Sequence, residues 1–209
     1  MSKRAGAVAE DTRERILTAA RSEFAERGFQ GSSLRRICAG AGVTTGALYF
    51  FFEGKDDLFQ TVISQATEPF TRLMNQHYEG ERAASDRHME EGAQADMEIS
   101  RLLIDLYFSN RQTWDILLHH LNHPYVQAFL DQFVETSTEH YQFLMSEAEK
   151  AIGKQPPDRF AIHQFVHMQV DAMLTLISHE FRREEMLCHS ETVVRMLRGA
   201  FRALILDEE

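Results

Sequence analysis

The sequence contains few of the residues that interrupt or cross-link a chain. Its 209 residues include only 4 prolines, 11 glycines and 2 cysteines. Because Cys38 and Cys188 lie far apart, the chain has neither a disulfide framework nor a CxxC metal motif. The scarcity of proline and the abundance of helix formers predict an all-α protein.

Long apolar runs are also missing. The first residues, MSKRAGAVAEDTRERI, lack the apolar stretch of a signal peptide, and charges interrupt every apolar run further along. We therefore expect no membrane span and a cytoplasmic location. The sequence has no HExxH motif, nucleophile elbow or glycine-rich phosphate loop, which predicts that the chain is not an enzyme and uses no cofactor.

The net charge of -10 is unevenly distributed. Residues 1–52 hold eight Lys and Arg residues against five Asp and Glu residues, a local charge of +3, so the remainder carries -13. A positive N-terminal segment followed by an acidic remainder is typical of a small DNA-binding module fused to another domain.

Three short helices are predicted in the N-terminal segment. After a disordered arm at residues 1–10, a helix begins at Asp11 or Thr12 and ends at Gly28. A second helix follows the serines at 32–33, and a third begins at Thr44 or Thr45 after a glycine turn. This pattern predicts a helix-turn-helix domain at residues 1–55, whose small third-helix residues approach the floor of the major groove.

Residues 56–209 are predicted to form a larger helical domain for ligand binding and dimerisation. Polar residues at 78–92 predict a loop, and the sequence leaves open whether Glu79–Gly92 is a lid or only a connector. Further helices are expected near residues 96–109, 111–121, 124–152, 158–183 and 190–206.

The N-terminal pattern resembles the TetR family of regulators. The resemblance covers about residues 12–60 and rests on four segments. They are the run from Arg15 to Phe29, Ser33-Leu34-Arg35-Arg36-Ile37-Cys38, the run from Gly42 to Phe52, and Lys55-Asp56-Asp57-Leu58-Phe59.

The resemblance implies a ligand-responsive transcriptional regulator, most often a repressor, that a small effector releases from a palindromic operator in double-stranded DNA. It also implies a homodimer formed through the last two helices. The residues implied to contact bases or phosphates are Ser33, Arg35, Thr44, Thr45, Gly46, Ala47, Tyr49 and Lys55.

Three positions depart from the family pattern. Phe50 and Phe51 stand where many relatives have Tyr or His, and Glu53 stands where Lys is common. The two phenylalanines remove possible phosphate donors, and the glutamate adds negative charge near the DNA. They leave open a helical ligand-binding protein with a weakened DNA module.

Aromatic residues and histidines supply candidates for the effector site. The candidate pocket residues are Tyr107, Trp114, Phe129, Phe133, His163 and His167. No metal is expected, but His163, His167 and Asp171 share one helix face and are the metal candidates. A metal-responsive sensor that uses this group, or the group His119, His120 and His123, is the alternative function.

Overall fold

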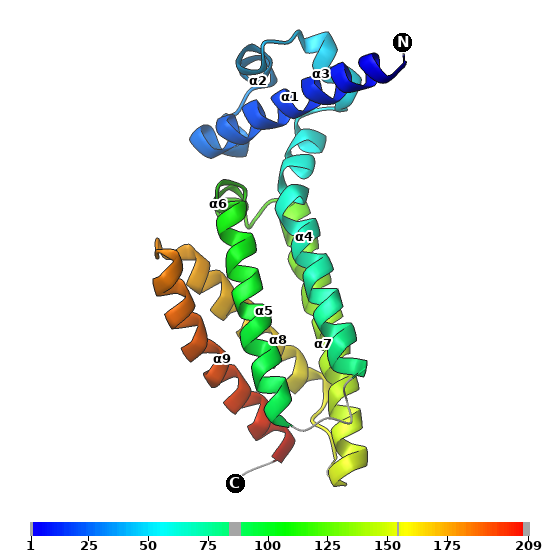
Figure 1. The fold of residues 1–209 in the computed structure, drawn as a ribbon, viewed down its shortest axis with the longest axis vertical. Coiled ribbons are helices and arrows are strands. Elements are labelled where there is room, and N and C mark those ends of the chain that lie inside the picture. The colour runs from blue at the N-terminus through cyan, green and yellow to red at the C-terminus, as the bar shows by residue number, and fades with distance from the viewer. Residues whose placement is uncertain (1, 84–88, 154, 207–209) are drawn as a thin grey trace. The chain divides into compact units, whose positions relative to one another are not determined.

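The computed structural model describes residues 2–83, 89–153 and 155–206, which form helices α1 to α9 without any strand (Figure 1). The all-α fold predicted from the sequence is confirmed. In the described residues, none of these helices has the length and apolar character needed to cross a membrane. The helices are α1 (Ser2–Gly31), α2 (Leu34–Ala41), α3 (Thr45–Phe51), α4 (Lys55–Ala83), α5 (Met89–Ser109), α6 (Arg111–Leu118), α7 (Pro124–Ile152), α8 (Arg159–Ser178) and α9 (Arg183–Leu206).

The chain forms two compact units. The first lies within Met1–Glu68 and Asn110–Val126, and the second within Pro69–Ser109 and Gln127–Glu209. The first unit extends beyond the predicted module of residues 1–55, because α6 packs against α1.

Apolar side chains from five helices form the core of the first unit. Helix α1 packs against α2, α3 and α6. The buried side chains include Ile16, Leu17 and Phe24 of α1, Ile37 of α2, Leu48 of α3, Leu58 and Phe59 of α4, and Ile116 and Leu117 of α6. This shared core holds the three N-terminal helices in fixed positions.

The helical path of α1 breaks at Gly28, as the sequence predicted. Gly28 has φ 66° and ψ 174°, a conformation that essentially only glycine adopts. The next residue, Phe29, donates its N–H to Nε2 of His120 at 2.7 Å. The other ring nitrogen of His120 donates to the carbonyl of Ile116 at 2.6 Å. His120 therefore joins the end of α6 to the end of α1, through two hydrogen bonds that occupy both ring nitrogens.

Replacing Gly28 by Ala is expected to lower the free energy of unfolding by about 1–3 kcal/mol. The positive φ at this position is strained for any residue with a Cβ, and the added Cβ would lie 3.3 Å from Nε2 of His120. The fluorescence of Trp114, the only tryptophan, reports unfolding of this unit in denaturant.

The matched control for this substitution is Gly31→Ala in the same stretch of chain. A Cβ at Gly31 would lie 3.5 Å from Cβ of Arg27, which is ordinary contact, so its unfolding free energy should stay equal or rise by about 0.4–1 kcal/mol. Equal effects of the two substitutions would contradict the strain at Gly28.

The second unit contains the rest of α4 and α7 together with α5, α8 and α9. Helix α9 packs against both α5 and α8. The ring of Phe70 in α4 lies 5.9 Å from that of Phe129 and 5.0 Å from that of Phe133 in α7. A further cluster joins α7 to α8 through Val134, Val166 and Val170.

The predicted disordered arm at residues 1–10 is wrong, because α1 begins at Ser2. Alanines at positions 5, 7 and 9 favour helix and no proline interrupts the segment. Thr12 is not a helix cap, since its hydroxyl donates to the carbonyl of Val8 one turn earlier.

The predicted loop at residues 78–92 is also wrong over most of its length. Helix α4 continues to Ala83 and α5 already begins at Met89. Residues 84–88 lie outside the described residues. Polarity misled the prediction, because Tyr78 is buried and Glu81 is hydrogen-bonded inside the unit. Tyr78 and Glu81 thus point into the unit, so their polarity does not indicate a loop.

The last two helices meet earlier than predicted. Helix α8 ends at Ser178 and α9 begins at Arg183, whereas the sequence placed these boundaries near residues 183 and 190. Glu185 accepts a hydrogen bond from the N–H of Arg182 at 2.9 Å and so caps the start of α9. His179 therefore caps the end of α8 and is not part of the helix.

Candidate nucleic-acid interface

A left-handed glycine ends α2 and produces the turn toward α3. Gly42 has φ 65° and ψ 38°, and its N–H donates to the carbonyl of Ala39. The guanidinium of Arg15 in α1 donates to the carbonyls of Ala41 and Gly42. A Cβ at Gly42 would lie only 3.0 Å from this guanidinium. The turn is therefore clamped to α1.

A buried carboxylate of α1 fixes the start of α2. Glu23 accepts from the N–H of Ser33 at 3.1 Å and from Nε of Arg36 at 2.6 Å. Arg36 also donates to the carbonyl of Gly31. Arg36 thus has a structural role, although it is exposed like its neighbour Arg35.

Helix α3 is short, anchored on one side and exposed on the other. The hydroxyl of Thr44 caps the helix by accepting from the N–H of Ala47 at 3.2 Å. Leu48 is fully buried and fixes the helix against the core. On the opposite side Thr45, Gly46 and Tyr49 are exposed. A fixed short helix with small residues at its exposed start suits close approach to base edges.

Phe50 extends this exposed surface as an unusual apolar side chain. It is 77% exposed, and its ring meets that of Phe51 edge to face at 5.0 Å. Glu53 is also exposed. The positions that depart from the family pattern therefore lie on or beside the exposed end of α3.

Lys55, predicted to contact phosphate, makes contacts of its own within the protein. Its ammonium donates to the carbonyl of Phe29 at 2.8 Å and reaches that of Ser32 at 3.5 Å. The same ammonium lies 4.5 Å from the centre of the Phe29 ring. Lys55 therefore joins the start of α4 to the turn between α1 and α2.

Cys38 is a core residue of α2. It is 4% exposed, and burial raises the pKa of its thiol. A thiol that resists ionisation is a poor nucleophile and a poor redox sensor. Cys38 therefore acts as a small apolar residue of the core.

The candidate effector residues are divided between the two units. Trp114 is buried in α6 of the first unit, and the other five belong to the second. Phe129 and Phe133 share the ring of Phe70 as a neighbour. Tyr107 is buried, and its hydroxyl donates to the carbonyl of Ile177.

The histidines of α8 meet each other and a threonine. Nε2 of His163 lies 3.1 Å from Nε2 of His167, and Nδ1 of His163 lies 3.4 Å from the hydroxyl of Thr138. Among the described residues, Asp171 does not complete a compact group of three ligand atoms with them.

The histidines near α6 act separately. Nδ1 of His119 donates to the carbonyl of Asp115, and His120 binds Phe29 as described above. The ring of His123 packs 4.3 Å from that of Phe59. Burial lowers the pKa of His123, although nearby Asp56 opposes this shift. These contacts account for the group through packing and hydrogen bonds.

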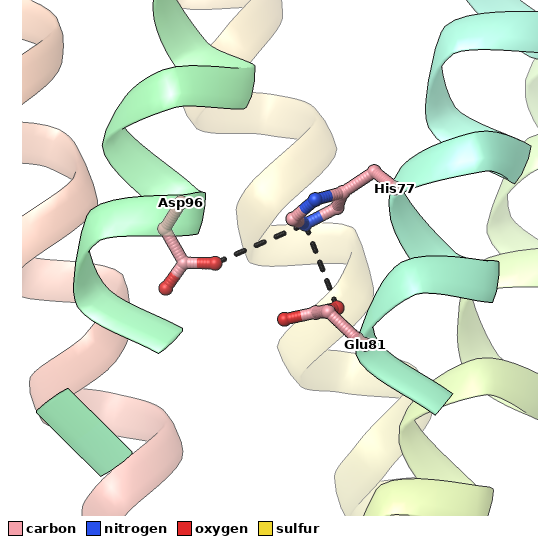
Figure 2. A group of neighbouring side chains, drawn as sticks. All are labelled: His77, Glu81 and Asp96. Atoms are coloured by element: carbon pink, nitrogen blue, oxygen red, sulfur yellow. Dashed lines mark ion pairs between the residues drawn. The ribbon is translucent and has the colours of Figure 1, made fainter. Parts of the chain in front are cut away.

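One group of ionisable residues was missed by the sequence reasoning. His77 and Glu81 of α4 meet Asp96 of α5 in the second unit (Figure 2). The spacing of His77 and Glu81, one helical turn apart, was a signal. It was overlooked because Glu81 fell within the predicted loop.

A family model and several known proteins are similar to this chain. The family model of bacterial regulatory proteins, tetR family, matches residues 16–62. The transcriptional repressor BepR of Brucella suis is 49% identical over 74 residues, which are 35% of each chain. The match thus spans about a third of the length of BepR. The transcriptional regulator UidR of Escherichia coli is 30% identical over 150 residues, which are 72% of each chain.

The chain belongs to the TetR family. The solved structure of the multidrug binding protein EbrR with malachite green has the same fold, with a TM-score of 0.56 and 21% identity. That likeness covers 88% of this chain and 96% of EbrR. The resemblance inferred from residues 12–60 is therefore confirmed, and the curated relatives BepR and UidR are a transcriptional repressor and a transcriptional regulator.

Proposed function

We propose that this TetR-family regulator is a repressor that binds a palindromic operator through α2 and α3 and leaves it when a small effector binds. The family binds operator DNA and small effectors and acts as dimers. The observation that carries the proposal is the exposed start of α3, fixed by buried Leu48 and by the clamped turn at Gly42. A cytoplasmic location follows from the proposed operator.

The proposed contacts follow from exposure and chemistry. Helix α3 would present its first turn to the bases, and hydroxyl and guanidinium groups beside it would bind phosphates. The residues proposed for bases are Thr44, Thr45, Gly46 and Ala47, and those proposed for phosphates are Ser33, Arg35, Tyr49 and Lys55. Lys55 is also proposed to position the start of α4, since its ammonium binds the carbonyls of Phe29 and Ser32.

The proposal is tested by selecting bound sequences from a pool of random duplexes. A palindromic site is expected, with half-sites about one helical turn apart or slightly more. The winning duplex, titrated at several salt concentrations, then serves to screen effectors for release. If folded protein enriches no sequence at low salt, with or without candidate effectors, the operator proposal fails and the weakened DNA module is favoured.

The last two helices are proposed as the dimer interface. Large apolar side chains are exposed on α8 and α9, namely Phe160, Met168 and Met196 at 69%, 54% and 69%. Exposed apolar side chains on neighbouring helices suit burial against a second copy.

Replacing Met196 by Asp is expected to raise the dimer dissociation constant at least about tenfold, because the interface would bury an unpaired carboxylate. Sedimentation equilibrium measures the change. The control is Val8→Asp, which alters an exposed apolar residue of α1 and should leave the dimer intact. A wild-type dissociation constant for Met196→Asp would place the interface elsewhere.

An apolar effector site is proposed within the second unit. Aromatic walls with a few polar groups suit apolar or cationic aromatic molecules. The proposed lining is Tyr107, Phe129, Phe133, His163 and His167. EbrR, whose solved complex contains malachite green, supports this class of effector. The comparisons give no support to a metal sensor built on His163/His167 or His119/His123, and we do not propose one at those residues.

A further inference from the structure

Three ligand atoms converge between α4 and α5 of the second unit. Nε2 of His77 lies 3.5 Å from a carboxylate oxygen of Glu81 and 3.9 Å from one of Asp96 (Figure 2). All three ligand atoms lie within 4.8 Å of one another. Figure 2 shows that the imidazole and both carboxylates point toward one another from the two helices.

This spacing suits a shared metal ion. Nitrogen and oxygen ligands bind zinc at about 2.1 Å, which places neighbouring ligand atoms roughly 3.4 Å apart in a tetrahedral site. The distances from His77, 3.5 and 3.9 Å, are close to this value, and the third pair lies within 4.8 Å, so the two carboxylates would move closer together around an ion.

Two further side chains hold the carboxylates in place. Nε2 of His140 in α7 lies 2.8 Å from the Glu81 oxygen that faces His77. Arg198 of α9 binds the other oxygen of Asp96, which leaves the remaining oxygen facing His77. Hydrogen-bonded carboxylates of this kind are a general feature of protein metal sites.

The buried side chain of His140 directs its hydrogen bond at the cluster. Its side chain is completely buried, and its ring stacks on that of Tyr78 at 4.1 Å. Its other nitrogen, Nδ1, is buried without a hydrogen-bond partner among the described residues. Within that part of the chain, the hydrogen bond of His140 is therefore directed at Glu81 and the cluster.

The charge balance favours a cation. Two carboxylates face the single guanidinium of Arg198, so the acidic groups outnumber the guanidinium by one. The side chains of His77, Glu81 and Asp96 are only 13%, 21% and 27% exposed. A partly buried net negative charge is stabilised by a bound cation.

We propose that His77, Glu81 and Asp96 bind one divalent transition-metal ion per chain, with His140 and Arg198 orienting the carboxylates. One imidazole and two carboxylates suit Zn²⁺, Mn²⁺ or Fe²⁺ better than a soft ion such as Cu⁺. Three protein ligands leave coordination positions for water. The ion would link α4 to α5.

The test is a calorimetric titration of Zn²⁺ and, separately, Mn²⁺ into the full chain, purified without an affinity tag and treated with chelator. Wild-type protein should bind one ion per chain. Asp96→Asn should weaken binding at least about tenfold, because it replaces a charged ligand by a neutral side chain of similar shape. The control is the double variant His163→Gln/His167→Gln, which removes the histidine pair of α8 and should bind as the wild type does.

The thermal midpoint separates metal binding from a purely structural ion-pair cluster. Zn²⁺ should raise the midpoint of the wild type and of the control, since an ion that binds the folded state stabilises it. At the same Zn²⁺ concentration it should raise that of Asp96→Asn by less, because the variant binds the ion more weakly. If this variant does not fold, His77→Gln replaces it, because it leaves the Asp96–Arg198 pair intact.

The proposal is overturned if the wild type binds neither ion. It is also overturned if Asp96→Asn or His77→Gln binds as tightly as the wild type, or if the control loses the site. None of these measurements involves DNA, so the result is independent of the proposed operator.

Discussion

The Thr45→Asp variant is expected to bind the selected operator at least about 100-fold more weakly than the wild type. Thr45 is exposed in the first turn of α3, where the helix is proposed to meet the bases. A carboxylate there would face DNA phosphates and would replace a small side chain at the groove floor. Loss of a base contact alone costs about 1–3 kcal/mol, and the added charge repulsion increases this cost.

The substitution separates binding from folding. An acidic residue in the first turn of a helix interacts favourably with the helix dipole, so the unfolding free energy should change by less than about 1 kcal/mol. The control is Thr18→Asp, which makes the same charge change at an exposed position of α1. Fluorescence anisotropy with the labelled duplex measures all three proteins. Equal weakening in both variants would mean that net charge, and not the surface of α3, decides the affinity.

The Phe59→Ala variant is expected to lose about 3–5 kcal/mol of unfolding free energy in the first unit. Phe59 is fully buried, and its ring lies 5.2 Å from that of Phe24 and 5.0 Å from that of Phe29. Both contacts are edge to face, which adds to the loss of buried apolar surface. The cavity would loosen the joint between α4 and the end of α1.

The same substitution at an exposed phenylalanine is the control. Phe50 is 77% exposed, so Phe50→Ala should change the unfolding free energy by less than about 0.5 kcal/mol. Denaturant titrations followed by the fluorescence of Trp114 report on the unit that contains both residues. A loss below about 1 kcal/mol for Phe59→Ala would show that this aromatic cluster does not hold the unit together.

The N-terminal helices could be predicted because their signals are local. Gly28 and Gly42 end helices through positive φ, and Thr44 caps α3 through its own hydroxyl. Such signals act within a few residues and are visible in a sequence. The spacing of the motif then identified the family.

The polar cluster could not be predicted for the opposite reason. Asp96 meets His77 across two helices, and His140 and Arg198 come from two more. Local polarity around Glu81 indicated a loop, whereas the helix continues to Ala83 and Glu81 is hydrogen-bonded to His140 inside the unit. Contacts between helices distant in sequence decide such cases, and a single sequence does not display them.

The contacts of Lys55 illustrate the same difficulty at a smaller scale. Its position in the family motif suggested a phosphate contact, which stays a prediction, but gave no sign that its ammonium binds the carbonyls of Phe29 and Ser32. The sequence placed Lys55 correctly at the start of α4. Its partner became visible only when the broken end of α1 was positioned beside it.

Methylation interference on the selected duplex tests the central claim most directly. Methylation of guanine N7 adds a group to the floor of the major groove, where α3 of each subunit is proposed to lie. We predict that it blocks binding at two clusters of guanines whose centres are about one helical turn apart or slightly more. Binding that no guanine modification affects would contradict the account, because α3 would then not read the major groove.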